Sequence, residues 1–118
     1  MKDRFKFRFW DKETKTMQKF PKIELRQRMT LDEILDDDRV IFMQCTGLRD
    51  KNSTLIYEGD IVKIFHVSGT MQGKYFFDAI EWNDLRCRFE TGNYGIIDDD
   101  DIYEVIGNIY ENPELLKE

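Results

Sequence analysis

Short runs of β-branched and aromatic residues, separated by turn-forming residues, recur along the chain and constrain its fold more than any other feature. The turn signals fall about every 8 to 12 residues, the spacing of small all-β sandwiches and barrels. The runs predict strands near residues 5–10, 17–20, 40–45, 61–67, 75–82, 87–90 and 103–110. A chain of 118 residues is long enough for one domain with a sizeable core. We therefore expect a mainly β single domain over residues 1–118.

The N-terminal segment combines a predicted strand with a short predicted helix. Residues 4–10 alternate between cations and aromatic rings, which is the period of a β-strand with two different faces. Three rings share the face that we expect in the core: Phe5, Phe7 and Phe9. The cations share the solvent face with Trp10. Further on, Thr30 and Glu33 form a capping box that predicts a short helix over residues 30–35.

The distribution of charge is more informative than the net charge of −6. Residues 1–28 contain 10 basic and 4 acidic side chains, a balance of +6, so the remaining residues carry −12. An asymmetry of this size indicates an interaction arm, or docking of one segment on the other. Residues 1–10 lack the apolar stretch of a secretory leader, and no apolar run is long enough to span a bilayer, so we expect neither feature. We therefore expect a cytoplasmic protein whose two cysteines, Cys45 and Cys87, are free thiols.

Residues able to support catalysis or metal binding are scarce. A zinc site would have to join His66, the single histidine, to Cys45, Cys87 and a carboxylate without any ligand spacing in the sequence. A nucleophilic pair of Cys45 and His66 has no supporting motif. The aspartate run at residues 98–101 lacks the glycine and the distal glutamate of an EF-hand loop and predicts a solvated turn. We expect a protein that is not an enzyme and that uses no metal or cofactor.

Three long strings stand in order along the chain. They are FRFWD at residues 7–11, MQCTGLRDKNSTLIYEGDIVKI at residues 43–64 and EVIGNIYENPELL at residues 104–116. In all three the chain resembles the YopX family of small phage and prophage proteins. Ser53 is a departure, because the family often has glycine after the DKN of the central string. A residue with a Cβ adopts a positive φ less readily than glycine, so we expect this turn not to require one.

The resemblance implies a small SH3-like barrel preceded by a β-hairpin and short-helix segment, in a bacterial host cell, and it brings no activity. We divide the single domain into a basic N-terminal segment at residues 1–38, a barrel core at residues 39–111 and a terminal helical turn at residues 112–118. The turn residues of the recurring strings are expected to be architectural: Gly47, Gly59, Asp60, Gly107, Asn112 and Pro113.

Binding is the expected function, and several forms of it stay open. A non-catalytic protein-binding module would present an exposed Trp10 and aromatic strands to a host or phage protein. A nucleic-acid-binding module would stack Trp10 on a base and place the basic arm on phosphates. The cations of that arm are Arg4, Lys6, Arg8, Lys12 and Lys15. The acidic remainder opposes nucleic acid, and instead suits mimicry of DNA toward a host DNA-binding protein. A competing interpretation is that the arm docks on the acidic remainder, either in the same chain or in a homo-oligomer. No membrane partner is expected.

Overall fold

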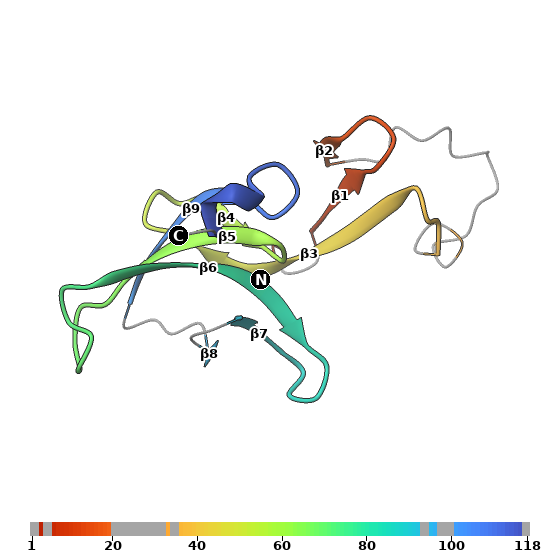
Figure 1. The fold of residues 1–118 in the computed structure, drawn as a ribbon. Coiled ribbons are helices and arrows are strands. Elements are labelled where there is room, and N and C mark those ends of the chain that lie inside the picture. The colour runs from red at the N-terminus through yellow and green to blue at the C-terminus, as the bar shows by residue number, and fades with distance from the viewer. Residues whose placement is uncertain are drawn as a thin grey trace.

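The computed structural model describes Asp3, residues 6–19, Glu33 and residues 36–92, 95–96 and 101–116. Across these residues the fold is mainly β, as the strand spacing predicted. Two antiparallel sheets curl into a half-barrel, from which one hairpin projects (Figure 1). In this described part of the chain, no helix has the length and apolar character needed to cross a membrane.

The first sheet has four strands in the order β2-β1-β3-β4. They are β1 (Phe7–Asp11), β2 (Thr16–Gln18), β3 (Val40–Arg49) and β4 (Leu55–Tyr57). The long strand β3 pairs with two strands: its first half pairs with β1, and its second half pairs with β4. The sequence prediction missed β4, which is only three residues long and lies between two turns.

The second sheet has five strands in the order β8-β7-β6-β5-β9 and supplies most of the main buried cluster. They are β5 (Asp60–Phe65), β6 (Tyr75–Asn83), β7 (Arg88–Thr91), β8 (Gly95–Ile96) and β9 (Ile102–Asn108). A 3-10 helix, η2 (Pro113–Leu116), follows. Alternate residues of these strands pack with β4 into one buried cluster of Ile56, Val62, Ile64, Ile80 and Tyr103. β-branched residues suit this half-buried pleated surface.

The loop between β3 and β4 covers the free edge of β9. The carboxylate of Asp50 accepts a hydrogen bond from the Val105 N–H at 2.9 Å. The Lys51 N–H donates to the Tyr103 carbonyl at 3.0 Å. These contacts occupy backbone groups that an edge strand otherwise offers to another chain.

Ser53, in the same loop, has a φ of +66°, so the expectation that serine avoids a positive φ there is wrong. The turn keeps the left-handed backbone that suits glycine, and the serine accepts the strain. The Ser53 N–H donates to the Asp50 carbonyl at 3.0 Å, which holds the residue in this conformation. A left-handed backbone costs a residue with a Cβ about 1–2 kcal/mol.

We expect Ser53→Gly to raise the free energy of unfolding by about 0.5–1 kcal/mol, because the strain relieved exceeds the added backbone entropy of the unfolded chain. Urea denaturation followed by circular dichroism measures this change. The matched control is Ser68→Gly at an exposed position without a positive φ, which should lower stability slightly. A loss of stability in Ser53→Gly would contradict the prediction.

Some sequence expectations fall outside the described residues. The helix predicted over residues 30–35 is one, since Glu33 is the single described position in it. Arg4, Phe5 and the first three aspartates of the run at residues 98–101 are others.

Candidate functional site

A buried ion pair anchors the N-terminal hairpin to the turn between β4 and β5. Nη1 of Arg8 lies 2.7 Å from Oδ1 of Asp60, and the two side chains are only 13% and 2% exposed. Arg8 also donates to the Glu58 carbonyl at 3.1 Å, and its guanidinium lies 4.9 Å from the centre of the Tyr57 ring. Burial raises the pKa of the Asp60 carboxyl, and the facing guanidinium opposes that rise. Arg8 therefore binds other residues of the same chain and stabilises the fold.

Trp10 is buried, so the expectation that it is exposed is wrong. Its side chain is 9% exposed and stacks on Tyr110, with 5.4 Å between ring centres. Phe9, on the other face of β1, is 8% exposed and packs edge-on against Phe42. Both faces of β1 are thus covered here, whereas Phe7 is 46% exposed. The alternation of rings and cations marked a strand correctly but did not mark which face meets water.

The predicted basic arm is divided by the fold. Its exposed cations are Lys6, Lys12 and Lys15. Lys6 pairs with Asp3 at 3.0 Å, and Arg4 lies outside the described residues. Since Arg8 and Trp10 are both buried in contacts with the rest of the chain, the structure does not bring the arm together as a surface for phosphates and bases.

Two glycines predicted to be architectural have a positive φ. Gly47 (φ +84°) lies in β3 where the register with β4 shifts. Gly59 (φ +86°) lies in the turn between β4 and β5 and is bonded to two other segments. Its N–H donates to the Ile80 carbonyl in β6 at 2.8 Å, and its carbonyl accepts from the Ile109 N–H after β9 at 2.9 Å. A Cβ at Gly59 would lie 3.0 Å from the sulfur of Met43. The backbone can approach this closely because glycine has no side chain.

The end of β9 is a compact turn. A Cβ on Gly107 would lie 2.5 Å from Oδ1 of Asn112, so this position is the close approach that the sequence indicated. The same Asn112 oxygen accepts a hydrogen bond from the Asn108 N–H at 3.2 Å. Pro113 then begins the 3-10 helix. This turn presents Tyr110 to Trp10.

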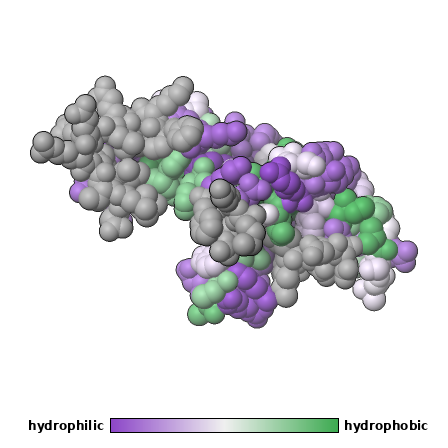
Figure 2. Space-filling view, turned by 180° about the vertical axis from the view of Figure 1, so that it is seen from behind, coloured by the Kyte–Doolittle hydropathy of each residue, from purple (hydrophilic) through white to green (hydrophobic). Residues whose placement is uncertain are grey.

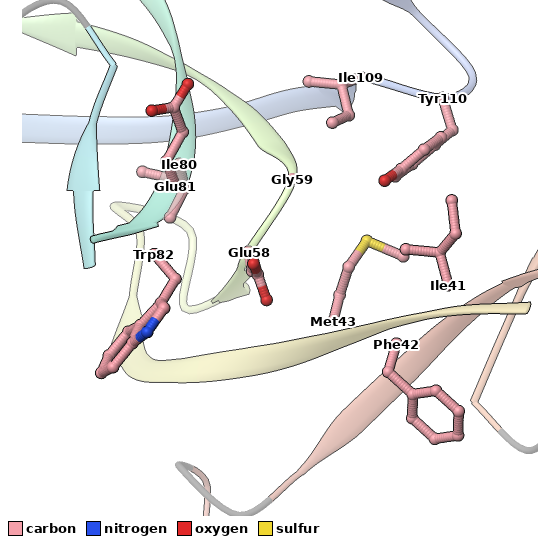
Figure 3. Close-up of a pocket in the computed structure, with 10 residues that line it drawn as sticks. All are labelled: Ile41, Phe42, Met43, Glu58, Gly59, Ile80, Glu81, Trp82, Ile109 and Tyr110. Atoms are coloured by element: carbon pink, nitrogen blue, oxygen red, sulfur yellow. The ribbon is translucent and has the colours of Figure 1, made fainter. Parts of the chain in front are cut away.

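A groove of about 270 Å³ lies between β3 and β6, beside the Arg8 anchor. Its apolar lining comes from both sheets and from the segment after β9: Ile41, Met43, Ile80, Ile109 and Tyr110. Figure 3 shows the Met43 side chain pointing toward Tyr110, whereas the Phe42 ring points away on the other side of β3. We call this feature the inter-sheet groove.

One partly buried carboxylate and one indole complete the inter-sheet groove. Glu81 also contributes to the lining, but its carboxylate points away from Glu58 and lies 2.9 Å from where a Cβ on Gly92 would be (Figure 3). Glu58 is partly buried and Glu81 is exposed, while Trp82 is 41% exposed at the end of β6. A carboxylate oxygen of Glu58 accepts from the Gln44 N–H at 3.4 Å. Burial raises the pKa of the Glu58 carboxyl. None of the described lining residues is a cation, so the groove is apolar, aromatic and acidic.

Comparison with known proteins gives the chain its family. The sequence profile of the YopX protein family matches residues 6–117. The chain belongs to the YopX family. The resemblance carried by the three strings is therefore confirmed, and the three strings meet in space. Arg8 from the first string lies against Asp60 from the second, and Trp10 stacks on Tyr110 from the third.

Two solved structures share this fold over nearly their whole length. Protein EF1440 from Enterococcus faecalis is 28% identical, with a TM-score of 0.64 over 95% of this chain and 97% of that one. YopX from Bacillus subtilis is 17% identical, with a TM-score of 0.58 over 97% of this chain and 99% of that one. No curated protein matches the chain.

The nucleophilic and metal-ligating side chains of this YopX-family protein lie apart. His66 pairs with Asp101 at 3.1 Å near one end of β6, and Cys87 lies in the turn at the other end. Cys45 is fully buried in β3. Within the ranges that the structure describes, no group of three His, Cys, Asp or Glu residues is placed to hold a metal ion.

The inter-sheet groove of this YopX-family protein was missed in the sequence. Ile80 and Trp82 alternate with Glu81, which placed the first two on one face of a strand. Glu58 directly precedes the predicted turn residues Gly59 and Asp60, and nothing in that position indicates a groove. The sequence contained no signal that β3 lies opposite β6, because that contact is made between two sheets and depends on the tertiary fold.

Proposed function

We propose that this YopX-family protein is a non-catalytic protein-binding module whose inter-sheet groove accepts a basic side chain of a protein partner. The groove's combination of an apolar lining, an exposed indole and a partly buried carboxylate carries the proposal. Arginine and lysine have an apolar stem below their charge. The stem would pack on the partly exposed side chains of Ile41, Ile109 and Tyr110, and the charge would meet Glu58.

The electrostatics of the groove favour such a ligand. Glu58 is already partly desolvated, as its raised pKa indicates, so much of the cost of burying this carboxylate is borne before binding. Trp82 offers the ring face on which cations bind best, a contact of about 0.5–2 kcal/mol. The acidic remainder of the chain would steer a basic partner toward the groove.

The proposal includes the origin and architecture that the family suggests. We place the module in the cytoplasm of a bacterial host, as a phage or prophage product, with the curled sheet around β5 forming a small SH3-like barrel. The match to the YopX family supports the origin, and the antiparallel order β6-β5-β9 with its enclosed core supports the barrel.

A random-peptide display library tests the groove. We expect the selected peptides to contain arginine or lysine beside an aliphatic or aromatic residue. Binding of a selected peptide should fall at least about tenfold in the double variant Glu58→Gln/Trp82→Ala, which removes one charge and the ring. The matched control is Glu13→Gln/Leu85→Ala, which alters an exposed carboxylate and an exposed apolar side chain outside the groove.

The pH dependence provides a second readout. Because the pKa of Glu58 is raised, this carboxylate takes up a proton at a higher pH than an ordinary glutamate. Peptide affinity should therefore weaken as the pH is lowered from 7.5 to 5. Selection of acidic peptides, or unchanged affinity in the groove double variant, would refute the proposal.

A further inference from the structure

The outward side of the second sheet carries two rows of side chains in register across three strands. One row is Tyr75, Phe65 and Ile102, and the other is Phe77, Lys63 and Glu104. We call these six residues the aromatic face. Its four apolar members are between 37% and 54% exposed. Figure 2 shows hydrophobic side chains gathered at the end of the molecule that holds the β5–β6 hairpin.

The pleat of the sheet explains why these rings are exposed. Val62, Ile64 and Tyr103 alternate with the residues of the aromatic face and point into the core. The core therefore uses one side of β5 and β9 and leaves the other side in water. A cluster of exposed apolar side chains in register is an interaction surface more often than a packing accident.

Cations are interleaved with the rings. Nζ of Lys63 lies 4.4 Å from the centre of the Tyr75 ring. Lys51 stands at the rim, 3.4 Å from Glu104, and lines with Lys63 a hollow of about 240 Å³. Lys74, next to Tyr75 in sequence, is exposed. The described charges of the face and rim are thus three lysines against two carboxylates, Glu104 and the neighbouring Asp101, whose oxygen lies 3.1 Å from Nδ1 of His66.

We propose that the aromatic face binds single-stranded nucleic acid. Bases stack on Phe65, Tyr75 and Phe77, and phosphates lie along the lysines. Exposed rings flanked by cations are the arrangement by which sheet surfaces hold single strands, and every base has a face that can stack. A duplex keeps its bases stacked inside, so it gains only the phosphate contacts. The partner that fits this surface is a single strand of any sequence.

The surface differs from the basic arm considered above, and it shares no residue with the inter-sheet groove. The ring contacts fit the same conclusion. Tyr75 and Phe77 lie 5.8 Å apart with a 60° tilt, so the two rings are not stacked face to face. A base stacking on Tyr75 would displace Lys63 from that ring toward a phosphate. The net charge of −6 weakens binding, but its range shrinks to about 10 Å at 0.1 M salt.

Fluorescence anisotropy of a labelled 20-nucleotide oligothymidylate at 50 mM salt, titrated with the full chain, tests the proposal. We expect saturable binding that weakens at least about tenfold in Tyr75→Ala/Phe77→Ala. A duplex of the same length should bind at least about tenfold more weakly than the single strand. In Lys63→Gln, the slope of log affinity against log salt should fall by about 0.7, the contribution of one phosphate contact to a single strand.

Matched control variants show whether a loss of binding comes from the aromatic face, from a change in overall charge or from unfolding. Leu85→Ala removes a side chain that is 96% exposed in another turn, and Lys12→Gln removes an exposed cation on the N-terminal hairpin. Both should bind as the natural chain does. The ring variant should keep its thermal unfolding midpoint within a few degrees, because the rings lie outside the core.

Three results would overturn the proposal. The first is the absence of an anisotropy change up to 100 μM protein, on the order of the weakest non-specific nucleic-acid affinities. The second is equal binding by the ring variant. The third is a concentration-dependent dimer, seen by light scattering, that the ring variant abolishes, because a second copy would then cover the face. The peptide selection above is unaffected by these outcomes, since it depends on the groove.

Discussion

Replacing Arg8 by methionine should lower the free energy of unfolding by about 3–5 kcal/mol at pH 7.5, the usual cost of removing one partner of a buried ion pair. The change leaves the Asp60 carboxylate, whose side chain is 2% exposed, without its cation. It also removes the hydrogen bond to the Glu58 carbonyl that ties β1 to the β4–β5 turn. Urea denaturation followed by tryptophan fluorescence measures the loss.

The pH dependence of this loss has a definite sign. Burial already raises the pKa of Asp60, and without Arg8 the pKa rises further. A carboxyl with a raised pKa in the folded state stabilises the fold fully below its unfolded pKa, and this contribution is lost as the pH rises through the folded pKa. The Arg8→Met chain should therefore be less destabilised at pH 5 than at pH 7.5.

Two further variants identify the buried pair as the cause. Arg8→Met/Asp60→Asn removes both charges and should recover part of the lost stability. Arg39→Met breaks an exposed pair with Asp37, whose arginine is 46% exposed, and should cost less than about 1 kcal/mol. Equal losses in Arg8→Met and Arg39→Met would contradict the anchoring role of Arg8.

Replacing Asp50 by alanine should cost about 2–4 kcal/mol, because it removes one acceptor for three backbone N–H groups. Oδ1 of Asp50 accepts from Asn52 at 2.8 Å and from Thr54 at 2.9 Å, while Oδ2 accepts from Val105 in β9. The loss should appear in urea denaturation and as faster amide exchange along β9. The control is Asp84→Ala at an exposed turn, which should change stability by less than about 0.5 kcal/mol.

At acid pH the free energies of unfolding of the Asp50→Ala variant and the natural chain should differ less. Burial acts to raise the pKa of Asp50, but the three backbone hydrogen bonds outweigh it and hold the pKa below its ordinary value of 3.8. A lowered pKa means that the contribution is complete above pH 3.8 and is lost as the pH falls through the folded pKa. A difference that stays constant between pH 6 and pH 2.5 would show that the carboxylate does not act through these bonds.

The sequence predicted most strands because their signals are local. Alternation and β-branched residues marked β1, β5, β6 and β9, and Gly59 marked the turn before β5. Each of these signals lies within a few neighbouring residues, where backbone geometry is decided. The three-residue β4 has too few residues to show a period.

Apart from the positive φ of Ser53 and the short strand β4, the wrong and missing predictions concern contacts between distant residues. Trp10 was expected in water because its neighbours on that face are cations, but Tyr110 covers it. The nucleic-acid alternative placed Arg8 on phosphate, but Arg8 pairs with Asp60. The inter-sheet groove likewise requires β3 to lie opposite β6. Tertiary packing decides which residues of an alternating strand are exposed, and no local pattern contains that information.

The contacts of β1 join residues that are far apart in the sequence, and this separation affects the folding rate. Trp10 meets a ring from position 110, and Arg8 meets a carbonyl 50 positions away. Such closures lose chain entropy before any contact compensates for it, so folding should take milliseconds to seconds, as in other small β proteins of high contact order. During synthesis β1 emerges before residue 110, so Trp10 cannot take its final place until the Tyr110 ring is available.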